Sequence, residues 1–76
     1  MKDILNSIII NLVENKESVS ITETEKEDET LYEVVVAEAD KGRVIGKQGR
    51  VAKSIRTVMR AIAFKEKKNI YIKFVD

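Results

Sequence analysis

The sequence contains no cysteine and no histidine. These absences exclude a disulfide, a thiolate nucleophile, an imidazole base and a zinc site built on thiolates. The acids also gather in the first half of the chain, apart from the basic residues of the second half, so no catalytic constellation emerges. We therefore expect no enzyme activity, no metal, no cofactor and no small-molecule substrate. The lack of cysteine fits a cytoplasmic location.

Proline is absent, and glycine occurs only three times, always between residues 40 and 50. Glycine adopts backbone conformations that other residues avoid, and it lets a second backbone approach closely. A chain that gathers its few glycines in one segment is predicted to have a shaped loop there. The three glycines are Gly42, Gly46 and Gly49.

No apolar run is long enough to span a membrane. The most apolar stretch, residues 4–13, is interrupted by Asn6, Ser7 and Asn11, and no small-residue cleavage site follows it. We expect an amphipathic helix over residues 3–14, with Asp3 capping its start, rather than a signal peptide or a membrane anchor.

The formal net charge of +1 hides a separation of the two signs. Residues 1–40 hold three lysines and eleven acids, whereas residues 41–68 hold ten Lys or Arg and one acid. Such a separation is typical of a protein in which one face binds a polyanion and the opposite face is acidic. The alternative is a pair of ordinary solvated surfaces that partly neutralise each other after folding, and charge alone does not decide between the two.

Side-chain periodicity predicts the remaining elements. Alternation predicts a hairpin around residues 18–38, whose second strand, residues 31–37, is the more buried, and a last strand over residues 69–75. A short helix over residues 41–45 follows the hairpin, with Asp40 as its N-cap, and a longer helix covers residues 50–65. The resulting order is α-β-β-α-α-β in one domain.

The helix expected over residues 50–65 has three different faces. Its core face is predicted to contain Val51, Ile55, Val58, Met59 and Ile62. A second face carries Lys53, Arg56 and Arg60, and we favour a solvated role for Arg60 because it lies two turns or more from the glycines. A third stripe consists of Ser54, Thr57, Ala61 and Phe64.

The segment between the two helices has the chemistry of an anion site. Gly46 and Gly49 permit a tight turn, and the following helix begins with free N–H groups and the positive end of its dipole. Lys47 and Arg50 add full charges, with Arg43 nearby. This combination suits the phosphodiester backbone of a nucleic acid.

The same residues resemble a KH domain, the RNA-binding module whose G-x-x-G loop clamps about four nucleotides. Here the loop is Gly46-Lys47-Gln48-Gly49, with Ile45 before it and Ile55 six residues after it. The element order resembles type II KH domains, and the length resembles the small stand-alone bacterial proteins of the KhpA (YlqC) family. The likeness covers nearly the whole chain but is specific mainly within residues 42–56.

The resemblance implies an α+β fold for residues 1–76, a single KH domain with a three-stranded sheet packed on one face by three helices. It further implies single-stranded RNA binding by a cytoplasmic post-transcriptional regulator or RNA chaperone. Aromatic residues are few and none lies in the loop, so we expect weak binding dominated by phosphate contacts. The expected RNA-binding residues are Gly46, Lys47, Gln48, Gly49, Arg50, Arg43, Ile45, Lys53 and Arg56.

One position departs from the KH pattern. Three residues after the second loop glycine, many KH domains have a large aliphatic residue, whereas this chain has Ala52. Val51 or Met59 is expected to fill the space, and no base preference is carried over from the family.

The resemblance also implies protein partners. A homodimer is expected through the stripe of Ser54, Thr57, Ala61 and Phe64, as is a heteromer with a larger multidomain KH protein. The alternative to a primary role in RNA binding is therefore a protein-interaction adaptor that acts as a subunit of such a complex.

Two other phosphate-binding motifs do not fit. A Walker P-loop requires Lys and then Ser or Thr after its last glycine, where this chain has Arg50 and Val51, and a dinucleotide fingerprint requires glycine where this chain has Val44. Gly42 is expected to be structural, relieving crowding where the strand meets the short helix.

Overall fold

Helices and strands follow one another in the predicted α-β-β-α-α-β order in the computed structural model, which describes residues 1–75. Short 3-10 turns (η) join several of them. The elements are α1 (Lys2–Ile10), η1 (Lys16–Ser18), β1 (Ser20–Glu25), β2 (Glu29–Val35), η2 (Glu38–Asp40), α2 (Lys41–Ile45), η3 (Lys47–Gly49), α3 (Arg50–Lys65) and β3 (Asn69–Phe74). The predicted fold class is confirmed.

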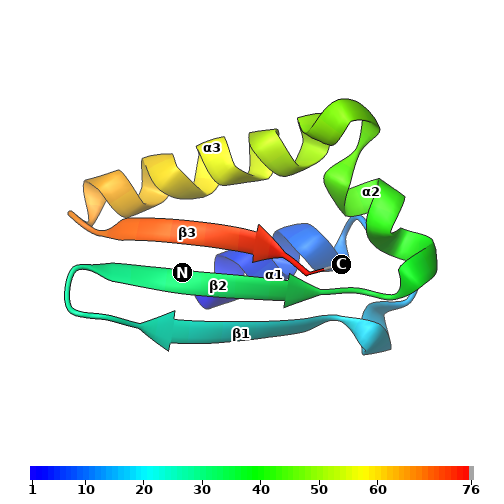
Figure 1. Ribbon diagram of the computed structural model, residues 1–76, viewed down its shortest axis with the longest axis horizontal. Coiled ribbons are helices and arrows are strands. Elements are labelled where there is room, and N and C mark those ends of the chain that lie inside the picture. Colours follow the sequence, from blue (N-terminus) through cyan, green and yellow to red (C-terminus); the bar gives the residue numbers. More distant parts are fainter. Residues whose placement is uncertain (76) are drawn as a thin grey trace.

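The sheet has the order β1-β2-β3, with β2 in the centre. β1 and β2 are antiparallel, and a hydrogen bond of 2.7 Å from the Lys26 amide to the Glu29 carbonyl closes their turn without a glycine. β2 and β3 are parallel. A parallel pair needs a long crossover, and α2, the glycine loop and α3 together form that crossover (Figure 1).

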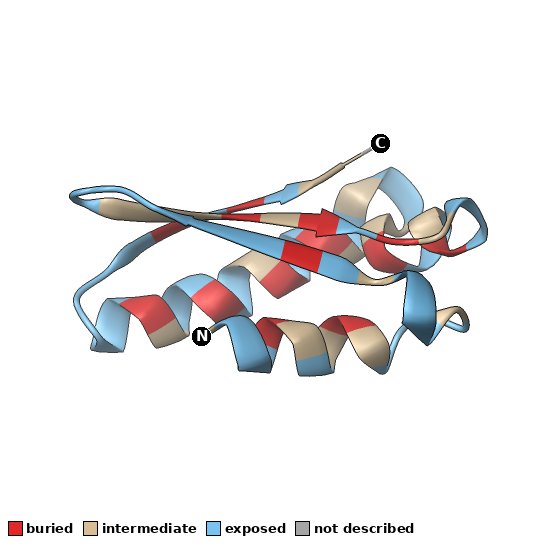
Figure 2. Ribbon diagram, turned by 90° about the horizontal axis from the view of Figure 1, so that it is seen from below, coloured by how far each residue is buried: buried red, intermediate tan, exposed pale blue. Residues whose placement is uncertain are grey.

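The helices cover one face of the sheet and leave the other face open (Figure 2). Alternate strand residues, among them Tyr32 and Val34 on β2, point into the layer between sheet and helices and are buried. Leu5 and Ile9 of α1 and Met59 of α3 meet them there, each with 0% exposure. This single apolar layer holds α3 beside β3 at one edge of the sheet.

The first helix is shorter than predicted. It ends at Ile10 rather than at residue 14, and the side-chain amide of Asn11 donates to the Ser7 carbonyl at 2.7 Å as the chain leaves the helix. The prediction that Asp3 caps the helix is wrong, because Met1 occupies the N-cap and Asp3 lies in the first turn. No helix among residues 1–75 combines the length and the apolar character that a membrane crossing requires.

The bounds predicted for α3 are confirmed, but its core face differs from the prediction. Ala52, Ile55, Met59 and Ala63 are the buried residues, whereas Val58, predicted to be in the core, is 49% exposed. At 3.6 residues per turn, Val58 lies about 100° around the helix from Met59. The buried stripe follows the sheet, and Val58 falls outside it.

Candidate nucleic-acid interface

The glycine loop has a backbone that ordinary residues do not readily adopt. Gly46 has φ 76° and ψ 173°, and Gly49 has φ 75° and ψ 13°. Between them Gln48 is also left-handed, with φ 57°. The amide of Gly49 donates to the Gly46 carbonyl at 3.1 Å, so the loop is a closed turn that leads directly into α3.

Of the three glycines, Gly46 is the most constrained. A Cβ atom at this position would lie 2.4 Å from Cγ2 and 2.9 Å from the amide nitrogen of Val51. Glycine is therefore required here by both conformation and space, because Val51 lies directly beside it. Gly49 is required by its conformation alone.

Gly42 is subject to neither constraint. Its φ is not in the left-handed region, and a Cβ atom there would meet nothing within 4 Å. The prediction that Gly42 relieves crowding is therefore wrong, because it lies on the exposed side of α2, away from the strand end.

The loop presents donors and unpaired cations to solvent. α3 begins at Arg50 with no side-chain cap. The Arg50 amide donates to the Lys47 carbonyl, and the N–H groups that follow it in the first turn are the ones left without a helical partner. Lys47, Gln48 and Arg50 are exposed, and neither basic residue forms an ion pair with a carboxylate of residues 1–75. Free N–H groups, the helix dipole and two cations converge on one place that suits an anion.

Arg43, predicted to be part of this basic set, has other partners. Its Nη2 atom lies 2.7 Å from Oε1 of Glu14, and its Nε atom lies 3.3 Å from Oδ1 of Asp40. The ion pair with Glu14 connects α2 to the segment after α1. Because both ion pairs already engage its guanidinium, Arg43 is not free to bind a phosphate in this structure.

Asp40 is the buried centre of this contact. Only 1% of its side chain is exposed, and its two oxygens accept hydrogen bonds from the backbone amides of Glu14 and Asn15 at 3.1 and 3.0 Å and from Nδ2 of Asn15 at 3.0 Å. Burial would raise the pKa of Asp40, but these hydrogen bonds and the charge of Arg43 outweigh it and lower the pKa below its ordinary value.

Asp40 occupies the N-cap position of α2, as predicted, but its side chain makes no cap hydrogen bond and bonds the earlier segment instead. Sequence reasoning missed its true role as the anchor of α2. No local pattern reveals this role, since the amides that it accepts from lie 25 and 26 residues earlier in the chain.

Arg56 lies between α3 and the free edge of β3. Its Nε atom donates to the Ile72 carbonyl at 3.1 Å, and its guanidinium carbon lies 5.4 Å from the centre of the Phe74 ring. Lys53, one turn closer to the loop, is exposed, and Ile45 is half-buried at the edge of the core. The structure thus brings the predicted residues to the loop and to the adjoining side of α3, but Arg43 and Arg56 both have partners within the fold.

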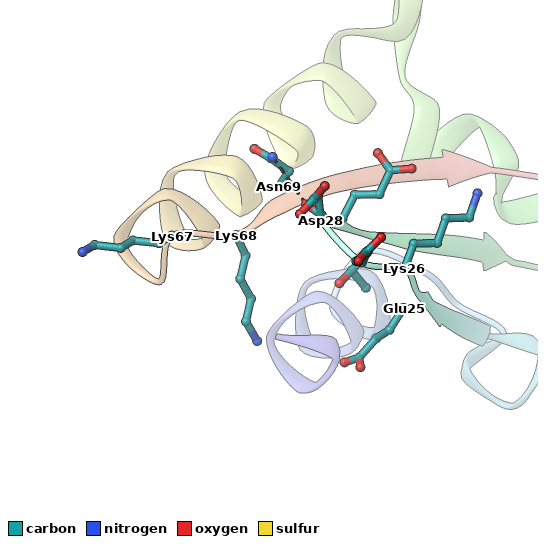
Figure 3. Close-up of a pocket in the computed structure, with 9 residues that line it drawn as sticks. Glu25, Lys26, Asp28, Lys67, Lys68 and Asn69 are labelled. Atoms are coloured by element: carbon teal, nitrogen blue, oxygen red, sulfur yellow. Dashed lines mark hydrogen bonds between the residues drawn. The ribbon is translucent and has the colours of Figure 1, made fainter.

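A hollow lies at the end of the molecule opposite the glycine loop, and acidic residues form much of its lining (Figure 3). It measures about 580 Å³ and is lined by the acidic turn between β1 and β2 and by Lys67, Lys68 and Asn69. Within residues 1–75, no three Asp or Glu side chains are grouped in a way that could hold a metal ion. This hollow is remote from the glycine loop.

Comparison with known families gives one family match and several full-length relatives. Residues 2–74 match a family described as KhpA/KhpB, KH domain. The RNA-binding protein KhpA of Clostridium acetobutylicum is 43% identical over 75 residues, which cover 99% of this chain and all of that protein. The protein of the same name from Listeria monocytogenes is 41% identical over the full length of both chains.

Among solved structures, a variant of Era from Aquifex aeolicus, bound to GDP.AlF4-, has a similar fold. The TM-score is 0.64, and the match covers 95% of this chain but only 28% of the Era chain. Sequence identity is 19%, so the likeness concerns the fold alone.

Proposed function

Because this chain belongs to the KhpA/KhpB family of KH domains, we propose that it binds single-stranded RNA through the loop Gly46–Gly49, as a post-transcriptional regulator or RNA chaperone in the cytoplasm. The observation that carries this proposal is the left-handed double-glycine turn at the start of α3, beside two cations without carboxylate partners. Relatives of full length are named RNA-binding proteins, which agrees with it.

The RNA backbone passes over the loop in this proposal. A phosphate lies at the free N–H groups of α3, where the absence of a Cβ atom at Gly46 and Gly49 keeps the approach open. Lys47 and Arg50 add charge, Gln48 adds polar contacts, and Lys53 extends the basic surface by one turn of α3. With about three phosphates neutralised, the slope of log K against log salt is roughly −2.

Bases then lie toward the groove between α3 and β3. Ile45 forms part of its apolar side, and Arg56 covers one carbonyl of the free β3 edge. We assign Arg43 a supporting role instead, because its ion pairs with Glu14 and Asp40 fix α2 and, through α2, the start of the loop.

The test of this function reverses the charge of the loop. In the double variant Lys47→Asp/Gln48→Asp, two carboxylates face the phosphate path, and Asp tolerates the left-handed conformation of position 48. The matched control is Lys26→Asp/Thr24→Asp, which makes the same change in net charge on the exposed hairpin. RNA binding at low salt, measured by fluorescence anisotropy, should be lost only in the loop variant. Unchanged binding by a loop variant with a native circular dichroism spectrum would show that the loop is not the site.

The adaptor role is a second candidate, favoured by the outward side of α3. Ser54, Thr57 and Ala61 are small and exposed there, and Val58 beside them is 49% exposed. We propose this surface for a homodimer or for a larger multidomain KH partner. We assign Phe64, predicted as the end of this stripe, to the hollow between α3 and β3 that it lines. A monomeric mass by light scattering at tens of micromolar would rule out the homodimer. Cellular function that survives in the loop variant would favour the adaptor role over RNA binding.

A further inference from the structure

A shallow hollow lies between the second half of α3 and the first half of β3. It measures about 220 Å³. Its floor includes the buried residues Ala63 and Ile70. Arg60, Lys68, Phe64 and Tyr71 also line it. Tyr71 alternates with the buried Ile70 and Ile72 on β3, so its side chain lies toward the open face of the sheet, and Phe64 is the aromatic side chain on the α3 side.

Both aromatic residues that line this hollow are exposed to an unusual degree. Phe64 is 82% exposed and Tyr71 is 49% exposed, although the chain has only four aromatic residues. Flat aromatic faces beside Arg and Lys are what proteins use to stack the bases of single-stranded nucleic acids while neutralising the phosphates. The sequence pattern had suggested a merely solvated role for Arg60.

A line of basic residues joins the glycine loop to this hollow. Gly49, Lys53, Arg56 and Arg60 follow one another at spacings of four, three and four residues, which places them on one side of α3. That side lies along β3, as the hydrogen bond from Arg56 to Ile72 shows (Figure 1). From Gly49 to Arg60 the helix advances about 16 Å, at 1.5 Å per residue.

We infer that the RNA strand held by the glycine loop continues along α3 and places a further base in this hollow, stacked on Phe64. Arg60 and Lys68 neutralise its phosphates. The inference rests on the proposed RNA-binding function and adds a second subsite to it. A strand with the stacked spacing of about 3.4 Å needs roughly five nucleotides to cover 16 Å, so the binding site grows from about four nucleotides to about eight.

The acidic turn sets the far limit of this path. Beyond Lys67 and Lys68 the next side chains belong to the turn between β1 and β2, which holds Glu25, Glu27 and Asp28 (Figure 3). Carboxylates repel a phosphate chain. The strand therefore leaves the protein after the hollow, and longer RNA gains no further contacts on the same molecule.

The test measures affinity against RNA length. Labelled oligouridylates of about four, eight and twelve nucleotides are titrated by fluorescence anisotropy against the wild type and against Phe64→Leu and Tyr71→Leu. The wild type should bind the middle length more tightly than the short one, with little further gain for the longest. Stacking contributes about tenfold or more in affinity per base. The double variant Phe64→Leu/Tyr71→Leu should therefore lose about tenfold in affinity for the middle length and almost none for the short one. The control Ile4→Ala, at an exposed apolar position of α1 away from the hollow, should match the wild type.

Two outcomes would overturn the inference and leave the loop proposal intact. One is a length dependence that persists in the Phe64→Leu/Tyr71→Leu variant, since the second subsite would then lie elsewhere. The other is a variant that loses the length dependence and at the same time changes from dimer to monomer in light scattering, which would assign Phe64 to a contact between subunits. Failure of the loop proposal looks different, because Lys47→Asp/Gln48→Asp would then bind all three lengths like the wild type.

Discussion

The helix α2 and the loop that follows it carry the same kind of charge and use it in opposite ways. In α2, Lys41 pairs with Glu38 at 3.0 Å and Arg43 pairs with both Glu14 and Asp40. In the loop and at the start of α3, Lys47 and Arg50 have no such partner within residues 1–75. The basic residues of α2 fix the scaffold, and those of the loop are left for a ligand.

This contrast separates preorganisation from binding. The hydrogen bonds from Glu14 and Asn15 to Asp40 fix the start of α2 to the segment after α1. The close contact between Gly46 and Val51 fixes the glycine loop against the first turn of α3. The loop cations then need no internal partner, because the backbone that carries them is already fixed. Variants in the two regions should consequently differ in which property they change.

The largest effect is expected at Gly46. In Gly46→Ala the new Cβ atom would overlap Val51, in a backbone conformation that is almost restricted to glycine. We expect a loss of about 3 kcal/mol or more in the free energy of unfolding, measured by urea denaturation, together with loss of RNA binding. That is a large fraction of the stability of a domain of this size.

Gly42→Ala is the matched control for that change. Position 42 is helical and open, so alanine should be neutral or raise the stability by about 0.5–1 kcal/mol and leave RNA affinity unchanged. Adding Val51→Ala to Gly46→Ala removes the overlap with Cγ2 but leaves that with Cβ and the amide nitrogen of residue 51, so only part of the lost stability should return. Equal effects of the Gly46→Ala and Gly42→Ala substitutions would contradict the loop geometry.

The next largest effect is expected at Asp40. In Asp40→Asn, an NH₂ group takes the place of Oδ2, which accepts hydrogen bonds from the backbone amide and from Nδ2 of Asn15. Hydrogen-bond donors would then face one another in a buried site, which is destabilising. The Tm should fall at pH 7. Because the folded-state pKa of Asp40 is lowered, its stabilising contribution is present above the ordinary Asp value of about 3.9 and is lost as the pH falls through the lower folded-state pKa. The difference in Tm between wild type and variant should therefore shrink below about pH 4. A difference that stays constant down to pH 2 would show that ionised Asp40 is not the anchor.

The local pattern of the sequence predicted the elements well because their causes are local. Helical spacing gave the bounds of α3, and alternation gave the hairpin and the last strand. The loop was predicted from Gly46 and Gly49 themselves. The first helix was too long in the prediction, since Leu12 and Val13 continue its apolar pattern through the turn that follows Ile10. The second strand was predicted two residues too far along the chain, because it runs from Glu29 to Val35.

Contacts between distant segments could not be predicted in the same way. Arg43 and Lys47 look alike in the sequence, and only the fold places two carboxylates beside Arg43. The hollow beside Phe64 depends likewise on where β3 lies against α3, which no spacing within α3 reveals. The three glycines also look alike, although only Gly46 meets a neighbour that excludes a side chain.

The smallest and most specific effect concerns the salt dependence of RNA binding. In Lys47→Gln one phosphate contact is removed, so the slope of log K against log salt should become less steep by about 0.7 while the Tm stays unchanged. In Arg43→Gln the slope should stay the same, and the Tm should fall by less than in Asp40→Asn, because the Arg43 side chain is 44% exposed and such ion pairs contribute little. Both slopes come from anisotropy titrations at several salt concentrations with the same short oligouridylate. If Arg43→Gln makes the slope less steep by as much as Lys47→Gln does, Arg43 breaks its ion pairs with Glu14 and Asp40 and binds a phosphate. In that case α2 is not only a scaffold, and the distinction from the binding loop does not hold.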